Sequence, residues 1–181
     1  LKVRGLIEQP LKVWGRGTEE ERRKKVDELL RSVNLDPEVV GDRKPTEFSG
    51  GQCQRISIAR ALSLEPQVLV CDEPVSSLDV SIQAQILNII QDMKQRYGLS
   101  LLFISHDLSV VRAISDRVIV MYLGRICEVS TPDKLANSPA HHYTHALVSA
   151  VPVADPTLGR RKAILQGEPP SPTNPPSGCR F

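Results

Sequence analysis

The chain has 181 residues, 23 basic against 21 acidic side chains, a net charge of +2 and only 4% aromatic residues. This length suits one domain with an appendage around an aliphatic core. The balanced charge lacks the basic excess of a dedicated nucleic-acid binder, and no apolar run reaches the ~18 residues of a membrane-spanning helix. Without a signal peptide, the sequence predicts a soluble, cytoplasmic chain, and its start at Leu1 rather than Met suggests a longer gene product.

The N-terminal part is expected to be helical. An apolar pattern over residues 3–11 is interrupted by Pro10, which predicts a broken helix. Thr18 and Glu21 have the spacing of a capping box, and the apolar stripe after them predicts a helix over residues 19–33. A connecting segment rich in Pro and Gly follows this helix and leads into the central part of the chain.

A second capping box opens a helix in the segment FSGGQCQRISIARALSLEP. Ser49 caps this helix, and Gln52 occupies the third helical position. Gly50 and Gly51 lack a Cβ atom, so a ligand oxyanion could approach the backbone N–H groups of the helix start. The helix dipole favours negative charge at the same place, which indicates phosphate binding.

A buried strand is expected directly after this helix. Residues 68–71 are all apolar, too short a run for a helix and typical of a strand covered on both faces. Asp72 and Glu73 follow at its end. Two carboxylates there could simply be the first polar residues of a surface turn, and that explanation would suffice if the neighbouring segments were ordinary.

A second strand completes a βαβ unit. Asp79 can cap a helix whose apolar stripe ends at Gly98, and residues 100–104 then predict another buried strand. The two strands should be parallel with a right-handed crossover, so the residues after both strands share the sheet edge where ligands bind. His106 lies at that edge, although a lone histidine is more often a packing or surface residue.

The remaining elements are shorter. Residues 108–115 predict a helix, residues 118–122 and 125–130 predict two strands around a turn, and Thr131 caps a further short helix. Seven of the 14 prolines fall in residues 152–181, which predicts an extended or disordered tail outside the core.

Neither the histidines near residue 141 nor the four cysteines predict a metal site or a disulfide framework. His141 and His145 share a helix face beside His142, but no acidic residue is spaced to complete a metal site. The cysteines show no CxxC spacing and are expected to be free thiols, buried by default; they are Cys53, Cys71, Cys127 and Cys179.

Several segments together resemble the ATPases of ABC transporters. Residues 49–52 (SGGQ) are similar to the signature motif, residues 68–73 to the Walker B strand and residues 76–79 (SSLD) to the D-loop. The context LLFISHDLS of His106 resembles the switch-histidine loop. A narrower resemblance lies in PAHHYTHALVSAVP, residues 139–152, which is similar to an appendage of oligopeptide and dipeptide importer ATPases, a group that includes some nickel importers.

The resemblance implies an α/β fold, a partial P-loop NTPase-type (ABC ATPase) parallel sheet with an N-terminal α-helical signature subdomain and a C-terminal extended tail. Residues 1–64 would form the helical subdomain, residues 65–138 the Walker B, D-loop and switch-histidine part, and residues 139–181 the importer appendage with its Pro-rich tail. No GxxxxGK[ST] sequence and no glutamine loop occur, so the resemblance covers only the later part of such an ATPase.

The same resemblance implies roles for individual residues with ATP and Mg²⁺ as cofactors. Asp72 would hold Mg²⁺ and Glu73 would polarise the attacking water, while His106 would contact the γ-phosphate. The remaining expected nucleotide contacts, to ATP held by a partner subunit or across the dimer, are Ser49, Gly50, Gly51, Gln52 and Asp79. The implied partners are a second ABC ATPase subunit and membrane-spanning permease subunits, at the cytoplasmic face of the inner or plasma membrane, with no nucleic acid.

Two other functions compete with a peptide-importer ATPase. An ABC ATPase that acts on DNA would show long coiled-coil heptads beside the signature motif, and the sequence has none. A catalytically inactive module that docks on a full-length partner would explain the missing P-loop. The intact Glu73 and His106 argue against that second alternative, and the isolated chain is expected to be inactive in either case.

Overall fold

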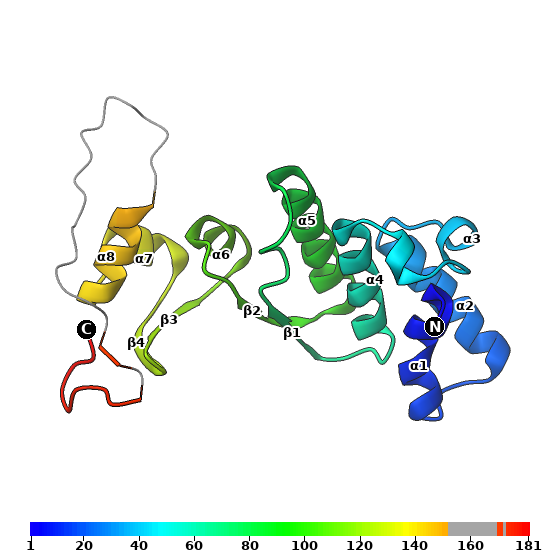
Figure 1. Ribbon diagram of the computed structural model, residues 1–181, viewed down its shortest axis with the longest axis horizontal. Helices are drawn as coiled ribbons and strands as arrows, with labels where there is room; N and C mark the ends of the chain where they lie inside the picture. Colours follow the sequence, from blue (N-terminus) through cyan, green and yellow to red (C-terminus); the bar gives the residue numbers. More distant parts are fainter. Residues whose placement is uncertain (152–169, 172) are drawn as a thin grey trace. The chain divides into compact units, whose positions relative to one another are not determined.

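The computed structural model describes residues 1–151, 170–171 and 173–181. The chain divides into two compact units, Leu1–Ser105 and His106–Phe181, and each is described by itself. The first unit contains, in chain order, α1 (Val3–Val13), α2 (Glu19–Ser32), α3 (Pro37–Val40), the 3-10 turn η1 (Pro45–Glu47), α4 (Gly50–Leu62), β1 (Val68–Asp72), α5 (Val80–Tyr97) and β2 (Ser100–Ile104) (Figure 1). The second contains α6 (Leu108–Ile114), β3 (Val118–Tyr122), β4 (Arg125–Ser130), α7 (Pro132–Asn137) and α8 (His142–Ala150).

Helices α1, α2 and α4 build the core of the N-terminal part. The three helices contact one another pairwise. Each buries the apolar residues that its helical period places on one face, namely Val3, Ile7 and Leu11 of α1, Val26, Leu29 and Leu30 of α2, and Ile56, Ala59 and Leu62 of α4. Each large aliphatic side chain buried in this way contributes about 2 kcal/mol to folding.

Helix α1 is continuous through Pro10, so the predicted break at this proline is wrong. A proline inside a helix removes one hydrogen bond and costs about 3 kcal/mol. Val3, Ile7 and Leu11 lie on one face at intervals of four residues and are 0%, 0% and 6% exposed. Their burial together contributes roughly twice what the proline costs, which explains why the helix continues.

The predicted helix over residues 19–33 is confirmed by α2, and its capping box is formed in full. The Glu21 N–H donates to Thr18 Oγ1 at 3.3 Å, and the Thr18 N–H donates to Glu21 Oε2 at 2.7 Å. The segment expected only to connect this helix to the next contains two short elements, α3 and η1. A sequence pattern of four or fewer residues is too short to show a helical period, so these elements were not predictable from it.

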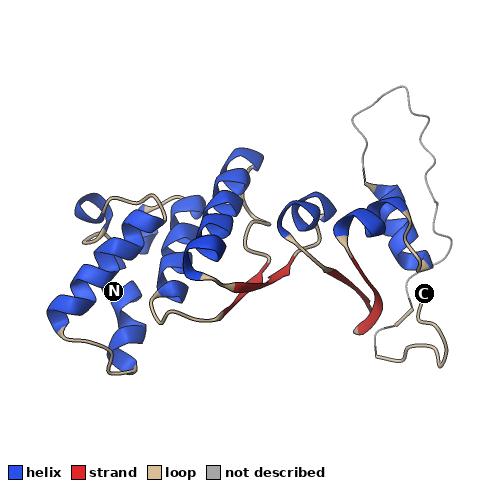
Figure 2. Ribbon diagram, turned by 180° about the vertical axis from the view of Figure 1, so that it is seen from behind, coloured by secondary structure: helices blue, strands red, loops and turns tan. Residues whose placement is uncertain are grey.

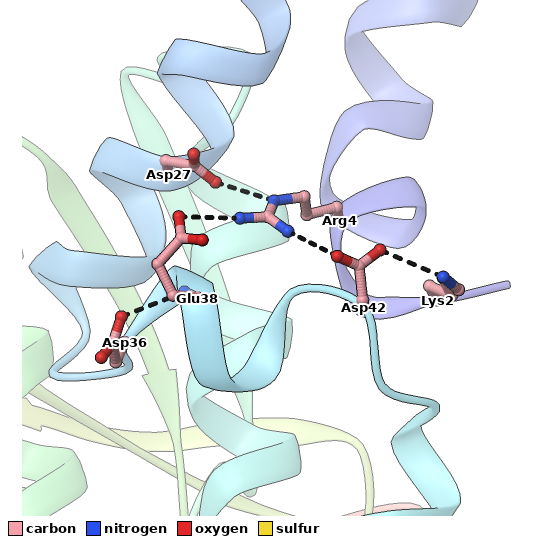
Figure 3. Close-up of polar contacts among 6 residues, drawn as sticks. All are labelled: Lys2, Arg4, Asp27, Asp36, Glu38 and Asp42. Carbon is pink, nitrogen blue, oxygen red and sulfur yellow. Dashed lines mark hydrogen bonds and ion pairs between the residues drawn. The ribbon is translucent and has the colours of Figure 1, made fainter.

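Arg4 joins α1 to the segments that follow it (Figure 3). Its guanidinium donates from Nε to Asp27 Oδ1 at 3.0 Å, from Nη1 to Asp42 Oδ2 at 3.0 Å and from Nη2 to Glu38 Oε1 at 3.4 Å. Lys2 adds a second cation to Asp42. The hydrogen bond to Asp27 raises the pKa of Arg4 above its usual value, although burial opposes this. One side chain thereby ties α1 to α2 and α3.

The predicted βαβ unit is confirmed. Strands β1 and β2 pair in parallel, from Val68 opposite Ser100 to Asp72 opposite Ile104, with α5 between them in the chain. Gly98 ends α5 in the left-handed conformation, with φ of 62°. The carboxyl ends of both strands therefore lie at one edge, as the sequence pattern required.

Only one face of the β1–β2 pair is covered within the described part of this unit. Leu69 and Cys71 are buried, whereas Val68 and Val70 are 58% and 59% exposed. Leu102 and Ile104 of β2 are exposed on the same side. Helix α5 lies on one side of the pair in both views (Figures 1 and 2). The prediction of strands covered on both faces is thus wrong for the described residues.

The second unit is built on the predicted β3–β4 hairpin. The strands pair antiparallel from Val118 opposite Ser130 to Tyr122 opposite Arg125. Leu123 and Gly124 form the turn with φ of 44° and 75°, the positive values that suit a two-residue hairpin connection. The other elements predicted for this unit are also present as α6, α7 and α8.

Helices cover one face of this hairpin as well. Val118 and Val120 form a core with Leu135 of α7, and residues of α6 and α8 pack against it, namely Leu108, Val111, Tyr143, Leu147 and Val148. The opposite face carries four exposed apolar side chains, Ile119, Met121, Ile126 and Val129. Each unit therefore presents one apolar sheet face to solvent in the part of the chain that the structure describes.

Glu128 attaches β4 to the start of α8. Its Oε1 accepts the Ala140 N–H and its Oε2 accepts the His141 N–H, both at 3.0 Å. Burial works against ionisation of this 9% exposed residue. Burial is the largest single influence, but the opposing influences together, led by the backbone N–H groups of Ala140 and His141, hold the pKa of the Glu128 carboxyl below its usual value.

The end of the chain packs on the second unit. The Phe181 ring lies 5.6 Å from that of Tyr122 and 5.4 Å from that of Tyr143, and Arg180 donates to the Leu123 carbonyl. Most of the tail predicted to be extended, residues 152–169 and 172, lies outside the described residues. The described tail residues form no helix or strand, but their last members are held by contacts that the proline content did not indicate.

All four cysteines are free thiols, but the expectation that they are buried holds only for Cys71. Cys53 and Cys127 are half-buried and Cys179 is exposed. Burial raises the pKa of the Cys71 thiol. Among the described helices, none combines the length and the apolar character that a membrane span requires. The boundary between the two units falls inside the predicted middle part, residues 65–138, and the division into three parts by motif stays a prediction.

Candidate functional site

The start of α4 carries the SGGQ segment in the predicted geometry. The Gln52 N–H donates to Ser49 Oγ at 3.4 Å, and the Ser49 N–H donates to Gln52 Oε1 at 3.0 Å, so the capping box is complete. Gly50 and Gly51 are the first two residues of α4, and the N–H groups of a helix start have no acceptor inside the helix. Because Ser49 and Gly50 are exposed, this start is accessible to an anion.

The SGGQ segment lies beside the acidic turn that follows β1. A Cβ atom added to Gly50 would lie 3.4 Å from Leu78 Cδ2, and one added to Gly51 would lie 2.5 Å from Ile82 Cγ2. Gly51 is buried, unlike Gly50. The structure thus brings residues 49–52 together with residues 76–79, two segments that the sequence placed on separate elements.

Asp79 caps α5 with its side chain. Its Oδ1 accepts the Ser81 hydroxyl at 2.6 Å and the backbone N–H groups of Ser81 and Ile82 at 3.2 and 3.1 Å. The Ser81 hydroxyl, followed by the Ile82 N–H, lowers the pKa of the Asp79 carboxyl. The side chain is exposed, so this cap also presents a negative charge at the surface of the turn.

Asp72 and Glu73 lie at the carboxyl end of β1, and both are exposed. The Glu73 N–H donates to the Ile104 carbonyl at 3.0 Å, which fixes Glu73 against the end of β2. Its own carbonyl accepts the Ser76 hydroxyl at 3.2 Å. These bonds hold the backbone of the acidic pair on both sides.

Glu73 has a left-handed backbone, with φ of 45°. A side chain in this region costs about 1 kcal/mol or more, and such strain is often concentrated at functional sites. No feature of the sequence indicated it, because Asn, Asp and Gly are the residue types that usually mark this conformation. The Glu65 backbone is the same in this respect, with φ of 52°, so positive φ alone does not identify a site.

His106 is the first residue of the second unit. The residue is exposed and lies between the end of β2 and the start of α6. Asp107 caps α6, since its Oδ1 accepts the Ser109 N–H at 2.8 Å and the Val110 N–H at 3.3 Å. This cap fixes the backbone next to the histidine.

One histidine of the appendage, His141, has a structural role. The Tyr143 N–H donates to His141 Nδ1 at 3.1 Å, so His141 caps α8. No group of three potential metal ligands occurs among the described residues.

Two segments of the chain match known families. Residues 3–76 match the family model described as ABC transporter, and residues 127–181 match the one described as oligopeptide/dipeptide transporter, C-terminal region. The oligopeptide transport ATP-binding protein OppF of Escherichia coli (strain K12) is 54% identical over 97% of this chain and 53% of its own length. OppF of Haemophilus influenzae is 51% identical over 100% of this chain and 55% of its own length.

Solved structures give the same assignment for the fold. The ATP-binding cassette MJ0796, in a dimeric post-hydrolysis state bound to ADP and Pi, is 31% identical with a TM-score of 0.64 over 73% of this chain and 57% of that one. A metal-chelate type ABC transporter in an inward-facing conformation has a TM-score of 0.68 at 23% identity over 75% of this chain and 54% of that one, which supports the fold alone.

The chain spans about half the length of the curated relatives it matches. The predicted mixed α/β fold and the predicted resemblance are confirmed by these similarities. By these matches, residues 3–76 belong to the ABC transporter family and residues 127–181 to the C-terminal region of the oligopeptide/dipeptide transporters, and the chain as a whole is similar to their ATP-binding proteins.

Proposed function

We propose that this chain forms part of the ATP-hydrolysing subunit of a membrane importer for oligopeptides or dipeptides. The observation that supports this most strongly is the packing of the SGGQ helix start against the turn of residues 76–79, directly after the carboxylates of Asp72 and Glu73. The peptide substrate class rests on the match of residues 127–181 and on the names of the relatives.

The helix start at Ser49 suits the γ-phosphate of ATP held by a second subunit. Ser49 offers a hydroxyl, and Gly50 offers a backbone N–H that no side chain of its own covers. The helix dipole adds a positive field at the same point. Since MJ0796 is a dimer in the state bound to ADP and Pi, we propose that the partner of this chain is a second ATPase subunit of the same family.

The acidic pair suits a magnesium ion and an attacking water. ATP·Mg²⁺, when bound, would supply the phosphoryl group and a cation that neutralises its charge. Asp72 is the exposed carboxylate that would hold the cation, and Glu73 would accept a proton from the water. The hydrogen bond from the Glu73 N–H to Ile104 orients that carboxylate by fixing its backbone. His106 would contact the γ-phosphate, and Asp79 would respond to the partner subunit.

The proposed site of action is the cytoplasmic face of the inner or plasma membrane, where the subunit would bind membrane-spanning permease subunits. ATP hydrolysis would then be coupled to import through the permease.

Glu73→Gln in a full-length protein carrying this region tests the catalytic proposal. The amide keeps the size of the side chain but cannot accept the proton, so ATP hydrolysis should fall by ~10²–10⁴-fold while ATP binding is retained. Glu65→Gln is the matched control, because Glu65 is also an exposed glutamate with positive φ. Phosphate release and nucleotide affinity are measured together. Near-normal hydrolysis by Glu73→Gln would remove this residue from the mechanism.

The substrate proposal needs a separate measurement. The full-length protein is reconstituted with its permease in vesicles, and uptake of labelled di- and oligopeptides is compared with uptake of a nickel chelate. We expect ATP-dependent peptide uptake that Glu73→Gln abolishes. Hydrolysis without peptide uptake, or uptake of the chelate alone, would contradict the substrate class and leave the ATPase assignment intact.

A further inference from the structure

The two glycines of the SGGQ segment have different surroundings. A Cβ atom on Gly51 would lie 2.5 Å from Ile82 Cγ2, closer than the 3.0 Å below which real Cβ atoms are essentially never found. On Gly50 it would meet only the end of the Leu78 side chain, at 3.4 Å. Neither glycine is among the residues with positive φ, so the difference is steric.

Ile82 links the start of α4 to the cap of α5. Its side chain lies against Gly51, while its backbone N–H donates to Asp79 Oδ1 at 3.1 Å. Further along the same two helices, Arg55 Nη2 donates to Gln85 Oε1 at 2.7 Å. Two contacts along one pair of helix faces therefore fix the SGGQ helix against the helix that Asp79 caps.

We propose that Gly51 and Ile82 are positioning residues that hold the SGGQ helix start on the turn of residues 76–79. The missing side chain at position 51 admits Ile82, and the missing side chain at position 50 leaves space for the phosphate oxygens. This inference rests on the proposed function, because it assigns the two glycines separate tasks within the same nucleotide site. Movement of the turn would then be transmitted to the signature helix through one packed contact.

Thermal unfolding of the chain tests the packing. Replacing a helical glycine by alanine normally stabilises a protein, so Gly50→Ala should leave the melting temperature unchanged or raise it. Gly51→Ala should lower it by about 5 °C, because the new methyl group overpacks the contact with Ile82. The opposite signs of the two changes in melting temperature would show that position 51 requires glycine for steric reasons and not for its backbone conformation.

A second substitution tests whether Ile82 is the cause. Ile82→Leu removes the Cγ2 branch but keeps the volume of the side chain, and combined with Gly51→Ala it should restore at least half of the lost melting temperature. Ile82→Ala serves the same purpose if leucine packs poorly. Ile89→Ala, which alters a buried isoleucine of the same helix, should not rescue Gly51→Ala. Additive effects of positions 51 and 82 would overturn the proposal.

ATP-dependent dimer closure, measured by cysteine crosslinking of full-length protein, tests the positioning role. Gly51→Ala should reduce closure at least tenfold, and the double variant Gly51→Ala/Ile82→Leu should recover it. Gly50→Ala should reduce closure without recovery by Ile82→Leu. If Gly51→Ala stays defective in the double variant although its melting temperature recovers, the ligand and not Ile82 requires the glycine, and the proposal fails.

The two measurements distinguish this inference from the proposed function. If wild-type protein does not close with ATP, the proposed function fails, while the melting experiment still decides whether Gly51 is required by Ile82. If the wild type closes and the melting effects are additive, the inference fails and the proposed function stands.

Discussion

Glu73 combines a strained backbone with an exposed carboxylate at the end of β1. Glycine would adopt its φ of 45° without steric conflict, so the glutamate is the more costly residue at this position. A costly residue in the strand-end turn next to Asp72 is consistent with selection for its chemistry rather than for stability.

Glu73→Gly should therefore raise stability and remove activity at once. We expect the melting temperature of the chain to rise by a few degrees, since relief of the left-handed strain gains about 1 kcal/mol. ATP hydrolysis by the full-length protein should be lost, as for Glu73→Gln. Differential scanning calorimetry and phosphate release measure the two effects. An unchanged or lower melting temperature would show that the surrounding hydrogen bonds, and not the side chain, set this backbone conformation.

Residue-scale features were predictable where their cause is local. The capping boxes of Thr18 and Ser49 depend on residues three positions apart, and both are present in the structure. The burial of Gly51 depends on Ile82, a residue on another helix, so no sequence window contained both. The assigned chemistry of the site residues stays a prediction, because neither the fold nor the similarities test individual roles.

At the scale of elements, packing outweighs local helix propensity in α1. Pro10 predicts a break, yet the buried stripe of Val3, Ile7 and Leu11 keeps the helix intact. The strands themselves were predicted correctly, but their burial was not. A short apolar run indicates a strand without showing how many of its faces are covered. Val68 and Val70 look as buried in the sequence as Leu69 does, and only the packing of the helices separates them.

Two glycines in the first unit should respond to alanine in opposite directions. A Cβ atom on Gly41 would lie 2.6 Å from both Arg4 Cζ and the Pro37 carbonyl oxygen, and the carbonyl belongs to the backbone and cannot turn away. Gly41→Ala should destabilise the chain by about 2 kcal/mol through overpacking. Gly5→Ala is the control, because its Cβ atom would meet only Leu1 at 3.8 Å, and alanine inside α1 should stabilise by about 0.5–1 kcal/mol.

Urea unfolding of both variants measures these changes. Equal effects at the two positions would contradict this prediction, because they would mean that both the Arg4 side chain and the Pro37 carbonyl make room for the new methyl group at little cost.

Glu128 should make the second unit sensitive to acid. Its pKa in the folded chain lies below the usual value of 4.5, because burial is outweighed by several influences together, led by the N–H groups of Ala140 and His141. A lowered folded pKa means that the stabilisation is present above pH 4.5 and is lost as the pH falls through the folded pKa. The attachment of α8 to β4 should therefore weaken on acidification.

Glu128→Gln measures the contribution of this carboxylate. The variant should melt at a lower temperature than the wild type at about pH 7. Its melting temperature should fall less than that of the wild type on transfer to about pH 3, because its amide does not titrate. Asp133→Asn is the control, since Asp133 is exposed and its pair with Arg112 is at the surface. If the melting temperatures of Glu128→Gln and wild type depend on pH in the same way, other groups determine the acid sensitivity.

At the scale of the whole molecule, the uncovered sheet faces can be related to the greater length of the relatives. In the first unit Val68, Val70, Leu102 and Ile104 are exposed on one side of the β1–β2 pair, although they are typical core side chains. The relatives are about twice as long as this chain, so they contain further residues that could cover such a face. The sequence indicated the missing P-loop, but the missing cover became visible only when the burial of each strand face was known.

The chain of 181 residues should bind ATP weakly and show no measurable ATPase activity alone. Triphosphate affinity in P-loop proteins comes from a nest of backbone N–H groups and a lysine on the β- and γ-phosphates, and no GxxxxGK[ST] sequence supplies them here. Asp72 and Glu73 by themselves present two exposed carboxylates to a polyanion, and the helix start at Ser49 supplies only one donor surface.

Calorimetric titration of ATP·Mg²⁺ into monodisperse chain, with phosphate release measured on the same sample, decides this point. We expect a Kd weaker than about 1 mM and no turnover above a buffer blank. The full-length protein, measured under the same conditions, is the positive control. Exposed apolar faces also favour self-association, so light scattering must first establish that the sample is monomeric. Micromolar affinity with turnover that Glu73→Gln eliminates would require a nucleotide site within these residues that does not depend on a P-loop.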